Sequence, residues 1–550
     1  MTATTLPAPA RVTAGGALAG TGTLLRFMLR RDRVRFPAWT LGVALLMGYF
    51  TTALNSVYST TEQLESVSEF STSPAGAIFG GPAYGYDAIT LERFLSGQYG
   101  LYIMLGAALM ALLTVTRHTR AEERSGRAEL VRANVVGRSA QLTAALILTA
   151  LMSAAVAVLV TAIMLAAGYA AAGSALFGAS VGAVGLVFGG IAAIAVQIFA
   201  FPRAASGLTG AVLGAAFVLR GIGDMSAVQD TGPSWLSWLS PLGWSQQTAP
   251  YVLDRWWPLA FSLACAAATA TAGYRLSARR DVDAGLVPPR PGSPRAAAWL
   301  RDAPTLAFRL QRAGIAGWSI ALLIAGVAYG AFAQPMADGL DDAPEDLIAV
   351  MGGSRDLVAG YLGTMGLTMA FAVTVFAVLA VQAVRAEESA GRTEPVLATA
   401  VSRTGWLGGN LAVTAIAVPW LLFLAGLGTG AAAAIGTGDA ALLWKTTLGH
   451  IAHAPAVWLL LAAAGLLYGA LPRALPIVWA ALGYGVVAGL FAPVLDLPDG
   501  AVRISPFAHV GEYPREHVSA AAVGVLILLT AALTALALRT FNRRDLKTGA

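Results

Sequence analysis

The sequence is poor in charge, in lysine and in cysteine. Only 12% of its 550 residues are Asp, Glu, Lys or Arg, about half the share found in ordinary soluble domains. Its two lysines, Lys445 and Lys547, lie outside any Gly-x-x-x-x-Gly-Lys-Ser/Thr loop, which excludes that route to ATP binding within this chain. The single cysteine, Cys265, excludes an intrachain disulfide.

Groups for catalysis or metal binding are also sparse. None of the five histidines falls in a zinc-protease pattern. His450 and His453 are three residues apart, a spacing that allows a metal site. The alternative is that they are solvated or cap a helix, and this interpretation is favoured. No nucleophile stands beside a base, so we predict no catalytic residue, no metal and no cofactor in this chain.

Apolar residues make up 57% of the chain, in runs of about 20 that are long enough to cross a bilayer as helices. The sequence therefore predicts an all-α polytopic membrane protein of about twelve spans. These are 36–54, 97–116, 141–168, 174–200, 206–222, 256–275, 315–333, 358–382, 409–435, 452–471, 474–493 and 519–538.

Basic residues give this set of spans an orientation. With the N-terminus inside, the cytosolic segments hold all of the 36 Arg and Lys residues except seven: Arg93, Arg220, Arg255, Arg355, Lys445, Arg503 and Arg515. Because such an excess marks the cytosolic side, both termini are predicted to be cytosolic. The sequence pI of about 9.5 is explained by these basic residues in the cytosolic segments, so nucleic acid is not needed as a partner.

A charged segment occurs twice. Residues 120–138 read RAEERSGRAELVRANVVGR and residues 385–403 read RAEESAGRTEPVLATAVSR, at an offset of 265. Polar identity of this kind does not follow from an apolar composition. The two segments share the pairs Arg120/Arg385, Glu122/Glu387, Glu123/Glu388, Gly126/Gly391, Arg127/Arg392, Glu129/Glu394 and Arg138/Arg403, among others.

The repetition extends to most of the chain. Ser240-Pro241 matches Ser505-Pro506 before the sixth and twelfth spans, and Arg279-Arg280-Asp281 matches Arg543-Arg544-Asp545 after them. Alternating apolar and basic residues before the first and seventh spans predict two amphipathic interfacial helices. Because each half has an even number of spans, the repeats are parallel. We predict repeats at 1–280 and 305–550, joined by a Pro-rich cytosolic linker at 281–304.

The doubled segment has two interpretations. A solvated loop on the cytosolic side accounts for basic residues, but not for their repetition beside three matched glutamates and a matched glycine. Docking of a cytosolic partner, once per half, accounts for both and is favoured.

The Glu-x-x-Gly-x-x-Glu pattern ending in Val401-Ser402-Arg403, the interfacial helix and the Ser-Pro element resemble type-2 ABC-transporter permeases. The fused twelve-span form resembles actinobacterial permeases that export polyketide (tetronasin-type) antibiotics. The resemblance implies that a homodimer of a separate cytosolic ATPase, holding ATP and Mg, docks on two coupling segments. Those segments comprise Glu122, Glu123, Gly126, Arg127 and Glu129 in one half, and Glu387, Glu388, Gly391, Arg392 and Glu394 in the other.

These patterns predict the permease subunit of an ATP-driven exporter in the cell membrane, surrounded by lipid and carrying apolar or amphipathic small molecules. Alternatives are a lipid or glycan exporter and a non-transporting membrane scaffold or sensor. An ion-coupled carrier is disfavoured because the span centres are nearly free of carboxylates.

Three residues are candidates for a transport pathway or gate: Arg220, Trp235 and Trp238. The alternative for Arg220 is that its side chain snorkels to the outer surface, and the alternative for the two tryptophans is that they anchor the chain at the membrane interface. Acidic segments at 55–95 and 334–357 are predicted to form short external helices.

Overall fold

The structure is a computed structural model. It describes residues 16–58, 64–65, 71–72, 74–133, 136–230, 232–281, 283–288, 292–334, 357–492, 495, 497–515 and 517–546. The chain forms two compact units, Met1–Gly292 and Ser293–Ala550. The division between them falls inside the segment that the sequence marks as a linker. The predicted external segment at 334–357 lies almost entirely outside the described residues.

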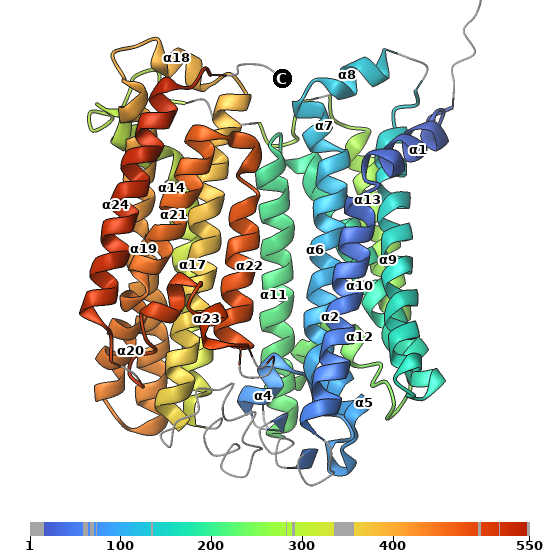
Figure 1. The fold of residues 1–550 in the computed structure, drawn as a ribbon. Helices are drawn as coiled ribbons and strands as arrows, with labels where there is room; N and C mark the ends of the chain where they lie inside the picture. Colours follow the sequence, from blue (N-terminus) through green and yellow to red (C-terminus); the bar gives the residue numbers. More distant parts are fainter. Residues whose placement is uncertain are drawn as a thin grey trace, which may run out of the picture. The chain divides into compact units, whose positions relative to one another are not determined.

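The first unit is a bundle of long helices with short helices at both ends. Its α-helices are α1 Thr21–Arg31, α2 Arg35–Val57, α4 Pro74–Phe79, α5 Leu91–Phe94, α6 Gly100–His118, α7 Arg120–Arg124, α8 Arg127–Arg132, α9 Ala140–Ala166, α10 Ala171–Ile198, α11 Pro202–Val228, α12 Pro241–Gln246 and α13 Pro258–Ser277. A π-helical turn, Leu95–Tyr99, joins α5 to α6, and Ser234–Leu239 forms a 3-10 helix. In Figure 1, α1, α7 and α8 lie at one end of this bundle, and α4 and α5 lie at the other.

Helix α10 is the centre of the first unit, and α6, α9 and α13 pack around it. Its glycines allow this close packing. A Cβ added at Gly178 would lie 2.5 Å from the carbonyl oxygen of Ala157 on α9, and one at Gly273 on α13 would lie 3.1 Å from that of Ala193. Glycine at these positions therefore lets α9 and α13 approach α10 closely. Gly210 and Gly214 on α11 have no such neighbour within 4 Å, so their spacing has no counterpart in packing within this unit.

The two predicted interfacial segments fold differently. Before the first span, α1 is a separate helix that buries Leu24 and Met28 on one face, and a turn at Asp32 separates it from α2. Before the seventh span, the corresponding residues belong to one continuous helix, α14 (Ala303–Ala331), which starts at an Asp302 capping box. The prediction of a second separate interfacial helix was therefore wrong.

The second unit has its own core around α17, α19 and α21. Its α-helices are α14 Ala303–Ala331, α17 Leu357–Ser389, α18 Thr393–Leu397, α19 Arg403–Thr437, α20 Ala441–Ala452, α21 Ala454–Ala470, α22 Ile477–Leu490, α23 Asp499–Val502 and α24 Ala520–Arg543. Short 3-10 helices, Pro472–Ala474 and Pro506–His509, precede α22 and α24. In Figure 1, α18 lies at one end of this unit and α20 at the other.

Each of the twelve predicted spans overlaps a helix. Eleven helices in the described part of the chain are long and apolar enough to cross a membrane. The remaining predicted span coincides with α13, whose 20 residues would extend about 30 Å. The chain is therefore an all-α polytopic membrane protein. Beyond α13, Leu286 and Val287 donate backbone hydrogen bonds to Gln197 and Ile198 at the end of α10, so the start of the predicted linker is attached to the bundle.

Candidate docking segments and the buried network of α11

The doubled segment folds into a helix, a turn and a second helix. In the first unit α7 and α8 are separated by Gly126, which has a φ of +72°. In the second unit α17 ends at Ser389, Gly391 has a φ of +70°, and α18 follows. Because a residue with a side chain is strained in this left-handed conformation, the turn explains why both copies have a glycine here.

Glu123 is held inside the first unit by two arginines. Arg280, just beyond α13, places Nη2 2.6 Å from Glu123 Oε1 and Nη1 2.9 Å from Oε2. Arg120 Nη1 donates to Oε2 at 2.7 Å, and its Nε donates to the carbonyl oxygen of Val196 at 3.0 Å. Helix α7 is therefore joined directly to the ends of α10 and α13.

Glu388 occupies the corresponding place in the second unit. Arg544, just beyond α24, donates from Nη2 to Glu388 Oε2 at 2.7 Å, and the hydroxyl of Tyr468 donates to the same oxygen at 2.6 Å. The guanidinium of Arg544 also lies over the rings of Tyr468 and Phe541, 5.3 and 5.4 Å from their centres. The repeated glutamate thus meets the repeated Arg-Arg-Asp element in both units.

A second ion pair is repeated across the turn itself. Arg127 Nε lies 3.1 Å from Glu122 Oε2, and Arg392 donates to both oxygens of Glu387 at 2.7 and 2.8 Å. These hydrogen bonds raise the pKa of the Arg392 guanidinium above its usual value. Glu122 is also paired with Arg31 of α1, which attaches the interfacial helix to the turn.

The candidate docking residues divide into two groups by burial. Glu122, Glu123 and Glu388 are buried in the ion pairs described above, and Glu387 is partly buried. Gly126, Arg127, Glu129, Arg392 and Glu394 are exposed, and Gly391 is half-buried. Leu130 on α8, which the sequence did not single out, is an apolar side chain 73% exposed at the same place. The surface that a partner can reach is therefore formed by the turn and by the first residues of α8 and α18.

Arg220 on α11 is fully buried, so the snorkelling interpretation was wrong. Its Nη1 donates to Asp224 Oδ2 at 3.0 Å and to Gln246 Oε1 on α12 at 3.1 Å. It also donates to the backbone carbonyls of Ala77 and Ile78 on α4. Arg220 therefore connects α11 to the short helices at the predicted outer end of the first unit.

Asp224 is a buried partner that the sequence analysis did not identify. Its Oδ1 accepts a hydrogen bond of 2.5 Å from the hydroxyl of Ser237, and it lies one helical turn after Arg220. The i,i+4 spacing of an acid and an arginine in an apolar run was the available signal. Trp238, next to Ser237, stacks on Trp257 with ring centres 5.2 Å apart, whereas Trp235 is 60% exposed.

His450 and His453 are both buried, so neither is solvated. His450 Nδ1 lies 2.8 Å from the carbonyl oxygen of Thr446, one turn earlier on α20. Within the described residues, no group of three or more His, Cys, Asp or Glu side chains is placed to hold a metal ion.

The long apolar helices and the duplicated turn at one end of each unit define a polytopic membrane protein built from two related halves. The family model described as multidrug efflux system permease Rv1217c, C-terminal domain, matches residues 22–276 and 300–542. The multidrug efflux system permease protein Rv1217c of Mycobacterium tuberculosis (strain ATCC 25618 / H37Rv) is 36% identical over 538 residues, which cover 97% of this chain and 96% of that protein. The chain belongs to this family of efflux permeases. It is a multi-pass protein of the cell membrane and the permease subunit of an exporter.

Proposed function

We propose that this permease is driven by ATP that a separate ABC-type ATPase binds with Mg and hydrolyses, and that two copies of the ATPase dock on it. The observation that carries the proposal is the turn that occurs once in each unit with the same glycine conformation and the same two ion pairs. Two equivalent docking surfaces suit two equivalent partner subunits.

The contacts of the turn supply a route for force. In the first unit, α7 is bonded through Glu123 to Arg280 beyond α13 and through Arg120 to the end of α10. Glu122 is bonded to α1. When the two ATPase subunits close on ATP, a push on the exposed residues Arg127 and Glu129 reaches these helices through short, buried ion pairs. The equivalent route in the second unit runs through Glu388 to Arg544 and α24.

The cargo we propose is an apolar or amphipathic small molecule, of which polyketide antibiotics of the tetronasin type are the leading candidates. The name of the mycobacterial relative, a multidrug efflux system permease, supports cargo of this kind.

The test is affinity purification of the tagged chain from its native membrane in mild detergent, followed by mass spectrometry. We expect one soluble ATPase in a ratio near two to one, with ATP hydrolysis stimulated by the cargo. Retention of no ATPase under several mild conditions would contradict the proposal.

A further inference from the structure

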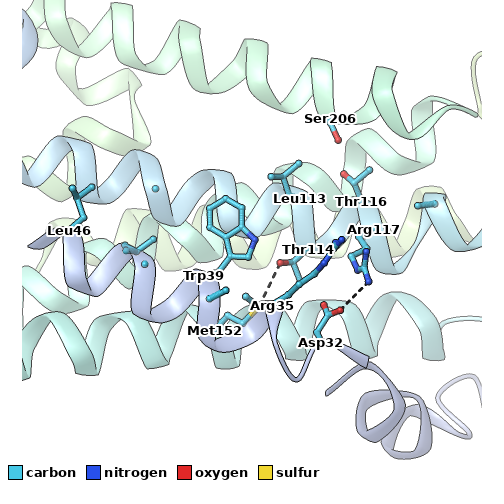
Figure 2. A pocket seen from close by; sticks show the side chains of 15 residues that line it. Asp32, Arg35, Trp39, Leu46, Leu113, Thr114, Thr116, Arg117, Met152 and Ser206 are labelled. Carbon is cyan, nitrogen blue, oxygen red and sulfur yellow. Dashed lines mark hydrogen bonds and ion pairs between the residues drawn. The ribbon is translucent and has the colours of Figure 1, made fainter. Parts of the chain in front are cut away.

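A large cavity lies within the first unit, outside the docking segments. Its volume is about 820 Å³, within the range of about 300–1,000 Å³ of small-molecule sites. It is lined by residues of α2, α6 and α9 and reaches Ser206 near the start of α11 (Figure 2). Its walls are mainly apolar and include Trp39, Val43, Leu46, Leu113 and Met152.

The charged residues of the cavity are gathered at one end, and Leu46 lies at the other (Figure 2). Asp32 is buried there, with Oδ1 3.3 Å from Arg117 Nη2 and Oδ2 2.6 Å from His118 Nε2. Arg117 Nε is buried and makes no hydrogen bond to any described residue. Arg35 is exposed, and no described carboxylate forms an ion pair with it. This end of the cavity thus holds one carboxylate and two guanidinium groups, which leaves an excess of positive charge.

The position of the cavity relates it to one leaflet. Arg35 and Leu46 are eleven residues apart on α2, which corresponds to about 17 Å along the helix. This is roughly half of the 30 Å hydrocarbon thickness of a bilayer. Because the charged end lies beside α1 and the docking turn, the cavity occupies the depth of the predicted cytosolic leaflet.

We propose that this cavity binds an amphipathic molecule with one anionic head group, whose charge is met by Arg35 and Arg117 and whose apolar body lies along Trp39, Val43 and Leu46. A carboxylate or phosphate is the natural partner of two guanidinium groups. The proposal names a class of ligand for the permease, and as a site for cargo it rests on the function proposed above.

The second half of the chain lacks the residues that make this end of the cavity. At the offset of the repeat, Arg117 and His118 become Gln382 and Ala383. If Trp39 is aligned with Trp318, Gln311 stands in place of Asp32 and Gly314 in place of Arg35. Gln311 is instead bonded to α19, where its Oε1 accepts a hydrogen bond of 2.9 Å from Thr414. The described residues of the second unit therefore do not repeat this site.

The test uses palmitate with a photoactivatable diazirine near the end of its chain, added to the full-length protein in lipid nanodiscs. The same chain with a trimethylammonium or an alcohol head serves as a comparison. We expect the carboxylate probe to label the peptides that contain Val43, Leu46 and Leu113. Labelling should fall about tenfold in the Arg35→Gln, Arg117→Gln double variant, because a bond to a charged group is lost. Arg33→Gln, an exposed arginine in the same connection that does not line the cavity, should leave it unchanged.

If the double variant does not fold, the loss of labelling is tested with Arg35→Gln alone. Arg35 is exposed, so its replacement disturbs no packing. Two sources of the ligand are separated by native mass spectrometry and ATP hydrolysis. A resident anionic phospholipid would copurify with the wild type and be lost from Arg35→Gln, whereas a transported acid would stimulate ATP hydrolysis by the complex. Equal labelling by all three head groups, or undiminished labelling of Arg35→Gln, overturns the proposal. Since labelling needs no ATPase, this result is independent of whether the proposed partner is found.

Discussion

Arg280 and Glu123 are joined by two hydrogen bonds, of 2.6 and 2.9 Å, although 156 residues lie between them. Arg544 and Glu388 form the corresponding contact in the second unit, at 2.7 Å. Both contacts join the turn after the second span of a repeat to the residues just beyond its sixth span. Each half of the permease therefore fixes its own docking turn to its own last helix.

Loss of the glutamate from this contact should destabilise the protein. Glu388→Ala leaves Arg544, which is mostly buried, without its carboxylate, and breaking a buried pair costs about 3–5 kcal/mol. We expect a lower thermal midpoint of the purified protein, measured by tryptophan fluorescence in detergent. Glu394→Ala, an exposed glutamate of the same segment, serves as the control and should change the midpoint little. Glu388→Ala combined with Arg544→Met should recover part of the loss, and a double variant no better than the single one would argue against the pair.

Reversal of the exposed charges should weaken binding of the ATPase without disturbing the fold. Glu129 in the first unit and Glu394 in the second are both exposed. Reversal of the buried Glu123 or Glu388 would disturb packing as well, so a loss of ATPase binding could not be assigned to the surface alone. We expect Glu129→Arg with Glu394→Arg to retain at least about tenfold less ATPase in affinity purification, because like charges at an interface repel. Asp499→Arg, at the exposed first residue of α23 on the predicted outer side, is the matched control. Full retention of the ATPase by the double variant would place the docking surface elsewhere.

Removal of Arg220 should release the short helices at the outer end of the first unit. Arg220→Met leaves Asp224 buried without its cation and the carbonyls of Ala77 and Ile78 without their donor. A loss of about 3–5 kcal/mol is expected, together with faster proteolysis within residues 74–90. Arg203→Met, an exposed arginine on the same helix, controls for the loss of a positive charge. Unchanged proteolysis of Arg220→Met would show that α4 is held by other contacts.

Close packing of α10 against α9 should make Gly178 intolerant of a side chain. A Cβ at this position would lie 2.5 Å from the carbonyl oxygen of Ala157, so Gly178→Val must push the two helices apart. Overpacking of this kind costs about 1–3 kcal/mol or more. Gly210→Val on α11 has no neighbour within 4 Å and carries the same change in helix propensity. The difference in thermal midpoint between the two variants measures the packing term alone, and equal midpoints would contradict the close approach.

The sequence by itself determined the class of this protein. Runs of apolar residues set the helices, because a bilayer requires about 20 such residues to cross it, and all twelve predicted spans overlap helices. The repetition of Glu123 and Gly126 at Glu388 and Gly391 revealed two related halves. A turn with a positive φ needs glycine whatever surrounds it, so that requirement is local and can be read in the chain.

Only the tertiary structure decided what the repeated residues contact. Glu122 and Glu129 have the same chemistry in the sequence, yet one is buried in ion pairs with Arg31 and Arg127 and the other is exposed. The pairing of Arg220 with α4 and α12 likewise depends on segments more than 20 residues away on either side. Which charge is buried depends on how distant helices pack, because packing alone decides where water is excluded and which opposite charge replaces it. The charged end of the cavity also depends on the tertiary structure, since it includes Asp32, at a turn that the continuous helix α14 does not make.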